Sequence, residues 1–102
     1  DTINFASGLT TITLTNEIVI NNAGTLTING LGANVLTIDG GAGTNRIFYI
    51  NQAIVTISGV TLMGGNGTGE RMQYGGGAIL AEGNSLTLDG VHVTGNTTSG
   101  SG

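Results

Sequence analysis

One short motif recurs along this chain and limits its fold more than any other feature. It consists of an apolar residue, Thr, a second apolar residue, a small polar residue and Gly. The four copies are Leu26-Thr27-Ile28-Asn29-Gly30, Leu36-Thr37-Ile38-Asp39-Gly40, Val55-Thr56-Ile57-Ser58-Gly59 and Leu86-Thr87-Leu88-Asp89-Gly90. Because apolar and polar residues alternate up to a Gly, each copy predicts a short, half-buried strand that ends at a turn. Each Gly is expected to supply a positive φ at that turn.

The motif belongs to a longer repeat. A shift of about 31 residues superposes Ile57 on Leu88, and a shift of about 29 residues superposes Leu26 on Val55. Self-similarity at a fixed period is typical of repeat architectures, in which equivalent parallel strands stack about 4.8 Å apart. We therefore expect Ile57 and Leu88 to be neighbours in one column of buried apolar side chains.

Three strands are predicted in each copy of the repeat. They are residues 17–20, 25–28 and 35–38, then 47–50, 54–57 and 60–62, then 77–81, 85–88 and 91–93. Residues 2–5 and 10–15 look like the remnant of an earlier copy, with Ile12 and Leu14 facing inward. The predicted fold is all-β, a right-handed parallel β-helix (a solenoid) of three to four coils with three strands per coil. The coils are residues 1–16 (partial), 17–46, 47–75 and 76–102 of a single segment, expected to be a fragment of a longer solenoid.

Composition favours strands and excludes several functions. Only 8% of the residues are charged, against roughly 25% in an average protein. The net charge is −4, and the two basic residues, Arg46 and Arg71, are too few for nucleic-acid binding. No apolar run reaches the ~20 residues that cross a bilayer, and residues 1–4 lack the features of a signal peptide. We expect no membrane insertion by this segment and an export signal outside it.

The longest predicted loop, residues 64–76, is the favoured place for ligand contact. It carries Glu70, Arg71 and Tyr74, and long loops on a rigid scaffold are where recognition residues concentrate. The alternative is a solvated loop in which Tyr74 only covers the edge of a coil.

A glycine-rich segment, residues 40–48, resembles the calcium-binding nonapeptide G-G-x-G-x-D-x-U-x, with Asn45 in the place of the Asp ligand. Such sites need tandem copies, because each ion is shared between adjacent turns. The other glycine-rich stretch, residues 64–69, has no Asp. We therefore expect a corner loop here, with no metal and no cofactor.

Paired carboxylates could perform glycosidic chemistry, and Asp39 and Asp89 are the candidates. Asp39 is predicted to end a third strand and Asp89 a second strand, so the two lie at different corners and do not converge. Alternation turns Val91 and Val93 inward, so His92 is expected to point to solvent near Asp89. No catalytic residue is predicted.

Outward threonines suggest a further alternative. The predicted ladder consists of Thr27, Thr56 and Thr87. Two adjacent ladders of hydroxyl groups could order water for ice binding, but Ile54 and Ser85 interrupt the column that begins at Thr25. Ice binding is therefore a minor alternative.

Several pieces of the sequence resemble a known family. Gly76-Gly77-Ala78-Ile79 is similar to its G-G-A-I motif, and the run 86–96 ends in Val93-Thr94-Gly95-Asn96, where the family has F-x-x-N. Residues 1–5 and 32–38 are similar to the first coils of large secreted bacterial repeat proteins. The chain thus resembles the right-handed parallel β-helix of pectin-lyase-like surface proteins, including chlamydial polymorphic outer membrane proteins and bacterial repeat adhesins.

The resemblance implies a non-catalytic structural or adhesive stalk, extracellular and anchored to the outer membrane or cell wall. Its partner would be a host or surface glycan or protein, and open end coils predict end-to-end self-association. The alternative is a coil segment of a carbohydrate-active enzyme of the pectate lyase or polygalacturonase type, or of a phage tailspike. Such an enzyme would need an acidic cluster with Arg, Lys or His on one strand face. The face formed by residues 47–50 and 78–80 has none.

Overall fold

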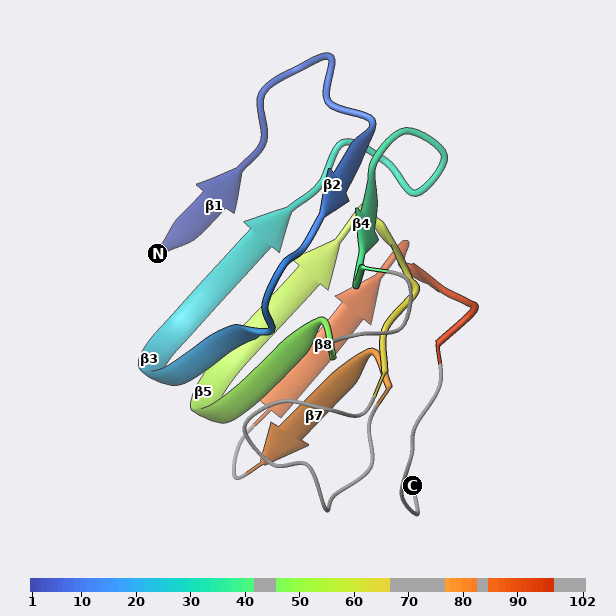
Figure 1. Ribbon diagram of the computed structural model, residues 1–102. Coiled ribbons are helices and arrows are strands. Elements are labelled where there is room, and N and C mark those ends of the chain that lie inside the picture. The colour runs from blue at the N-terminus through green and yellow to red at the C-terminus, as the bar shows by residue number, and fades with distance from the viewer. Residues whose placement is uncertain (42–45, 67–76, 83–84, 97–102) are drawn as a thin grey trace.

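The computed structural model describes residues 1–41, 46–66, 77–82 and 85–96, which form only β-strands and their connections (Figure 1). The strands are β1 (Thr2–Asn4), β2 (Thr11–Thr13), β3 (Ile18–Asn29), β4 (Thr37–Asp39), β5 (Phe48–Ser58), β6 (Thr61–Met63), β7 (Ile79–Glu82), β8 (Ser85–Asp89) and β9 (His92–Val93). Within these residues, no helix of the length and hydropathy needed to cross a membrane occurs. The predicted all-β class is confirmed.

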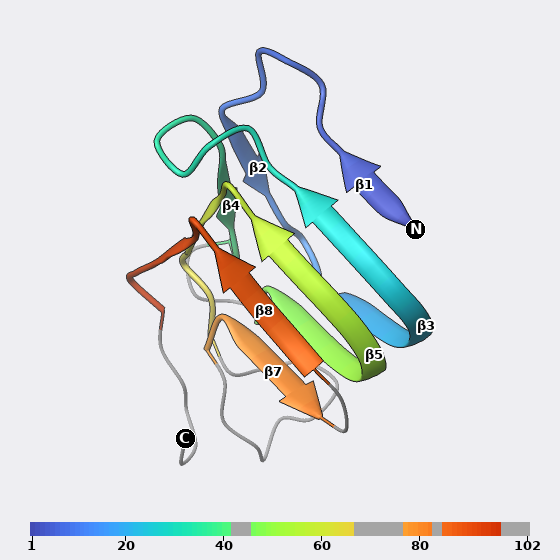
Figure 2. The same ribbon diagram turned by 180° about the vertical axis from the view of Figure 1, so that it is seen from behind.

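The strands form two sheets in which every pair is parallel. The first sheet has the order β1-β3-β5-β7, with β8 also paired to β5, and the second has the order β2-β4-β6-β9. Figures 1 and 2 show β3, β5 and β8 side by side in one layer. Parallel pairing follows from the repeat, because equivalent segments run in the same direction in every copy.

The strands β3 and β5 are long because each bends and contributes two segments to the first sheet. The sequence predicted these segments as separate strands, and the structure joins them. At the bends Asn22 and Gln52 have φ values of 54° and 53°, and the register between β3 and β5 shifts between Asn21 and Gly24. In β5 one left-handed residue, Gln52, turns the chain, whereas in β3 two such residues, Asn22 and Gly24 (φ 65°), lie at the bend.

The pairing of residues between successive parallel strands, here called the vertical register, matches the repeat. Ile57 pairs with Leu88 and Leu26 pairs with Val55, so the shifts of about 31 and 29 residues are confirmed. Ile12 and Leu14 pack against the core, as predicted. Equivalent residues of successive copies are therefore neighbours in space, although they are distant in the sequence.

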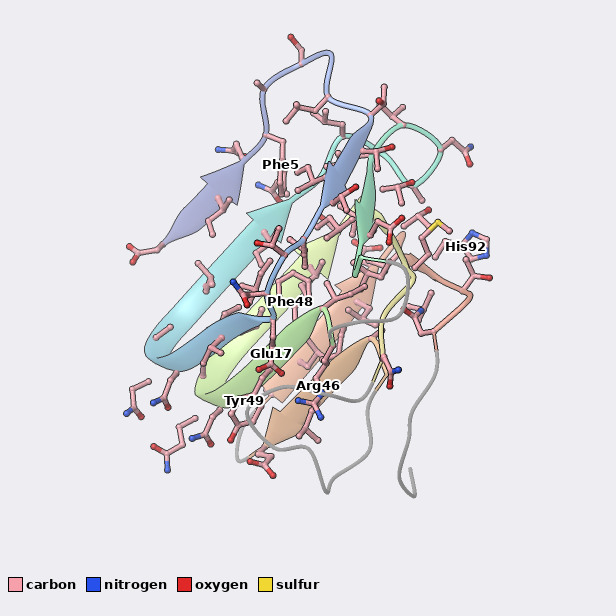
Figure 3. The ribbon with its side chains drawn as sticks, viewed as in Figure 1. Phe5, Glu17, Arg46, Phe48, Tyr49 and His92 are labelled. Atoms are coloured by element: carbon pink, nitrogen blue, oxygen red, sulfur yellow. The ribbon has the colours of Figure 1, made fainter. Side chains whose placement is uncertain are left out.

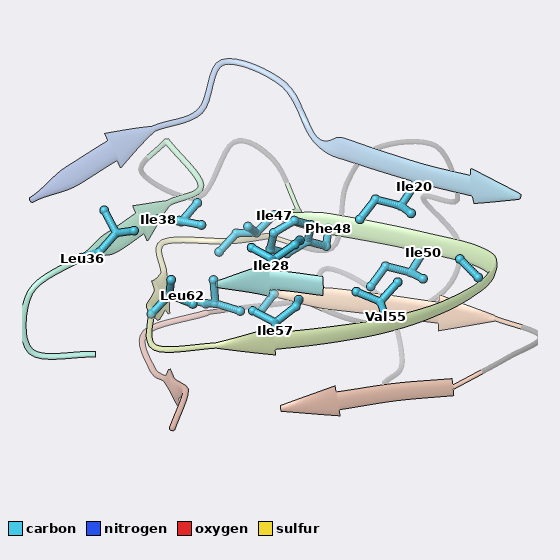
Figure 4. Close-up of a cluster of buried hydrophobic side chains, with 13 residues drawn as sticks. Ile20, Ile28, Leu36, Ile38, Ile47, Phe48, Ile50, Val55, Ile57 and Leu62 are labelled. Carbon is cyan, nitrogen blue, oxygen red and sulfur yellow. The ribbon is translucent and has the colours of Figure 1, made fainter. Parts of the chain in front are cut away.

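The apolar core lies between the two arms of the bent strands and the second sheet. In Figure 4, Phe48 and Ile50 on one arm of β5 face Val55 and Ile57 on the other arm. Leu62 from β6 packs into the same cluster. Since burial of an aliphatic or Phe side chain contributes about 1.5–3 kcal/mol relative to exposure, this cluster is the main source of stability.

Burial along the columns falls off towards both ends of the stack. The first apolar column is Ile3, Ile28, Ile57 and Leu88, and the second is Ile12, Ile38, Leu62 and Val93. The two middle members of each column are at most 3% exposed, whereas Ile3 is 44%, Leu88 42% and Val93 46% exposed. An open apolar hollow of about 290 Å³ lies at the N-terminal end, against Ile3, Ile18 and Ile20. Each copy thus depends on its neighbours for burial.

The corner glycines meet two different requirements. Gly59 and Gly90 have φ values of 67° and 64°, as predicted, but the prediction of a positive φ was wrong for Gly30 and Gly40. A Cβ atom at Gly30 would overlap the carbonyl oxygen of Gly59 and Cγ1 of Val60. The close stacking of successive corners therefore selects glycine at this position.

Candidate functional site

Four threonines form a column on the outer surface of the first sheet. They are Thr2, Thr27, Thr56 and Thr87, which pair in register across β1, β3, β5 and β8. The predicted ladder of the last three is confirmed, and the structure adds Thr2 to it. Neighbouring strands place adjacent members about 4.8 Å apart, so the hydroxyl groups repeat regularly along the stack.

A second polar column lies two residues further along the same strands. It consists of Asn4, Asn29, Ser58 and Asp89. Asn29 Nδ2 donates a hydrogen bond to Asn4 Oδ1 at 3.3 Å, and Ser58 Oγ donates to Asn29 Oδ1 at 3.4 Å. We call this column and the threonine column together the polar face. The motif marks Asn29, Ser58 and Asp89 as its recurring small polar residue, and the structure shows that they form a column with Asn4.

Two residues before the threonines on the same strands, the positions are not all polar. Thr25 pairs with Ile54, and Ile54 pairs with Ser85, so the interruption predicted for this column is confirmed. The polar face is therefore two columns wide in the part of the chain that the structure describes.

A third set of polar contacts lies near the bend of the long strands. Asn51 Nδ2 donates to Asn21 Oδ1 at 3.2 Å, and Glu82 pairs with Asn51 in register. The hydroxyl group of Tyr49, which is buried, donates to Glu82 Oε1 at 2.8 Å. These contacts join three successive copies of the repeat, and their geometry indicates a structural role.

A buried ion pair lies at the corner before the long strands (Figure 3). Arg46 Nη1 donates to Glu17 Oε2 at 2.6 Å, and the two side chains are 0% and 6% exposed. Because Glu17 precedes β3 and Arg46 precedes β5, the pair links two copies of the repeat. Sequence analysis missed it. The separation of 29 residues, equal to the repeat spacing, is the signal that could have found it.

The carboxylates that were considered for catalysis lie apart, as predicted. Asp39 belongs to β4 in the second sheet, and Asp89 ends β8 in the first. Asp39 Oδ1 accepts a hydrogen bond from the backbone N–H of Gly41 at 2.9 Å, which is a turn contact. His92 is exposed, as predicted, and Figure 3 shows its ring pointing away from the core.

The predicted contact residues Glu70, Arg71 and Tyr74 lie outside the described residues, and so does Asn45 of the calcium-like segment. Within the described ranges, no three side chains of the His, Asp, Glu or Cys type come together as a metal site. The polar face is therefore the described surface from which function can be argued.

Comparison with protein-family models, with curated proteins and with solved structures gives no significant match to this chain.

Proposed function

We propose that this chain is a segment of a right-handed parallel β-helix that serves as a non-catalytic structural or adhesive stalk on a bacterial cell surface. The observation that carries the proposal is the vertical register, in which Ile28, Ile57 and Leu88 stack in one column. Crossover connections between parallel strands of one sheet are right-handed in about 98% of cases, which supports the proposed hand.

A stalk needs stiffness in one direction and a surface that repeats along it. In a solenoid each added copy contacts only its neighbours and extends the column by about 4.8 Å. The hydroxyl and amide groups of the polar face can donate and accept hydrogen bonds without bringing a cluster of charges. This chemistry suits contact with a host or surface glycan or protein. The location of Asp39 and Asp89 in different sheets supports a non-catalytic role.

The solenoid architecture is tested by duplicating one period. A variant that carries residues 30–58 twice in succession should fold, lengthen by about 4.8 Å in small-angle scattering and unfold at a higher urea concentration, because a nearest-neighbour interface is added. A matched insertion of 29 Gly and Ser residues after Ser58 is the control and should destabilise the chain. An unchanged length for the duplicated variant, with the extra segment open to protease, would contradict the solenoid.

The surface role is tested on the cells that produce the protein. An antibody raised against the 102-residue chain should label intact cells as strongly as permeabilised cells. Labelling only after permeabilisation would contradict the surface assignment. In parallel, the protein should release no reducing ends or unsaturated products from polygalacturonate, and release of either would favour the enzyme alternative.

Ice binding is a second candidate, favoured by the second column of the polar face. The two columns place polar groups at intervals of about 4.8 Å along the stack and about 6.6 Å across it, a regular array that can order water. The wild-type chain should then slow ice recrystallisation, and Thr56→Lys should abolish the effect because a long charged side chain breaks the array. Met63→Lys, an exposed position in the second sheet, should leave it unchanged. Normal recrystallisation with the wild-type chain would remove this candidate.

A further inference from the structure

We infer that the pair Asn29-Gly30 is a site of spontaneous deamidation, and that the stacking of β5 on β3 keeps it unreacted until the two strands separate. Asn followed by Gly is the pair in which an Asn side chain reacts most readily with the backbone, because Gly has no side chain to obstruct the approach. The chain holds a second such pair, Asn66-Gly67, of which Gly67 lies outside the described residues. This inference goes beyond the proposed stalk, since it assigns a covalent modification.

The reaction needs only water as a co-reactant. The backbone nitrogen of Gly30 loses its proton and attacks Cγ of Asn29, the new N–Cγ bond closes a succinimide ring, and Nδ2 leaves as ammonia. Water then opens the ring. Addition at Cγ breaks the new bond and gives aspartate at position 29, whereas addition at the backbone carbonyl carbon breaks the original peptide bond and gives isoaspartate, in which the chain runs through Cβ and Cγ.

Both reacting groups are held by hydrogen bonds to the neighbouring strands. The nitrogen of Gly30, which is the nucleophile, donates to the backbone carbonyl of Ser58 at 2.7 Å. The Asn29 amide donates through Nδ2 to Asn4 Oδ1 at 3.3 Å and accepts at Oδ1 from Ser58 Oγ at 3.4 Å. Asn29 is exposed, so water reaches it in the folded chain. Strand pairing therefore protects the site, because the Gly30 nitrogen attacks only after its bond to Ser58 is broken.

The stacked corner prevents the isoaspartate product from returning to the native pairing. Gly30 lies so close to the next copy that even a Cβ atom on it would overlap the carbonyl oxygen of Gly59 and Cγ1 of Val60. Isoaspartate adds a methylene group to the backbone directly before Gly30, where there is no room for one. The close stacking thus selects Gly, Gly makes the preceding Asn reactive, and strands that separate and form isoaspartate do not stack again in the native register.

Peptide mapping by mass spectrometry tests the inference, because replacement of the amide NH2 group by OH raises the mass of the peptide that contains residue 29. In mildly alkaline buffer the folded chain should convert Asn29 more slowly than the chain unfolded in urea, by about tenfold or more, since core strands open rarely. A synthetic peptide of residues 26–32, incubated with and without urea, corrects for the direct effect of urea. Equal rates in the folded and unfolded chains would overturn the inference.

Ile57→Ala and the milder Ile57→Val test whether separation of the strands controls the rate. Ile57 is fully buried and pairs with Ile28, so trimming it weakens the contact of β5 with β3 and leaves the reacting residues unchanged. Both variants, while folded by circular dichroism, should convert Asn29 faster than the wild type, Ile57→Ala by the larger factor. Met63→Ala, at an exposed position in the second sheet, is the matched control and should not change the rate. Folded Ile57 variants that react at the wild-type rate would contradict the inference.

The effect of isoaspartate on stacking has its own readout. Chains with isoaspartate at position 29 are prepared by incubation in urea and separated by chromatography, and Asn29→Asp supplies the ordinary aspartate product as the control for the change of charge. Both are made with Asn66→Gln, so that the second Asn-Gly pair does not react. The isoaspartate chain should unfold at a lower urea concentration than the Asn29→Asp chain. Equal midpoints would refute the claim that the corner at Gly30 excludes the added methylene group.

Discussion

Arg46→Met should be among the most destabilising single substitutions in this protein, lowering the free energy of unfolding by about 3–5 kcal/mol. The guanidinium group of Arg46 is fully buried and holds Glu17, whose side chain is only 6% exposed. Removing the positive charge takes away the guanidinium group that donates to Glu17 Oε2 at 2.6 Å, while the carboxylate stays out of water. Urea unfolding followed by circular dichroism measures the loss.

The double variant Glu17→Met/Arg46→Met separates the cost of removing the Arg46 guanidinium group from a buried carboxylate from the net contribution of the ion pair to stability. Because a buried ion pair can often be replaced by apolar side chains at little cost, the double variant should recover most of the stability lost in Arg46→Met. Asp89→Asn, at an exposed carboxylate, is the control and should change stability by no more than about 0.5 kcal/mol. A double variant less stable than Arg46→Met would contradict this explanation and indicate that Glu17 has a second essential role.

Much of the sheet pairing could be predicted from the sequence, because the residues that the repeat superposes are the residues that pair between neighbouring strands. Once Ile57 is placed over Leu88, the alternation of apolar and polar residues fixes which neighbours face inward. The threonine column followed from the same alignment. Register is this well determined because a slip by one residue would turn the apolar side chains to solvent.

Other features depend on contacts between copies and could not be read from a single motif. Asn22 and Gln52 adopt left-handed conformations at the two bends although neither is Gly, and only the first bend has a left-handed Gly nearby, Gly24. Arg46 and Glu17 occupy equivalent positions before β5 and β3. The sequences around these two positions differ, so the pairing is evident only once the two copies of the repeat are aligned. The motif marks Asn29, Ser58 and Asp89 as residues before a turn, but the hydrogen bonds that link Asn4, Asn29 and Ser58 across successive strands are evident only in the structure.

The second large effect is expected at Gly30, where substitution by Ala should cost about 3 kcal/mol or more. The φ angle of Gly30 is outside the left-handed region, so Ala incurs no left-handed penalty there. The penalty is steric, because the new methyl group overlaps the carbonyl oxygen of Gly59 and Cγ1 of Val60. Adding Val60→Ala should restore little of the lost stability, because it removes the overlap with the Val60 side chain but not the overlap with the backbone carbonyl of Gly59. The free energy of unfolding of the two variants in urea tests both statements.

Gly90 provides the matched control, because it occupies the equivalent corner of the last copy with no copy stacked beyond it in the described residues. A Cβ atom there meets nothing closer than the backbone N of Gly59 at 4.0 Å, while φ is +64°. Gly90→Ala should therefore cost only the left-handed penalty of about 1–2 kcal/mol. If Gly30→Ala proved no more destabilising than Gly90→Ala, backbone conformation and not the close stacking of corners would decide where glycine is required.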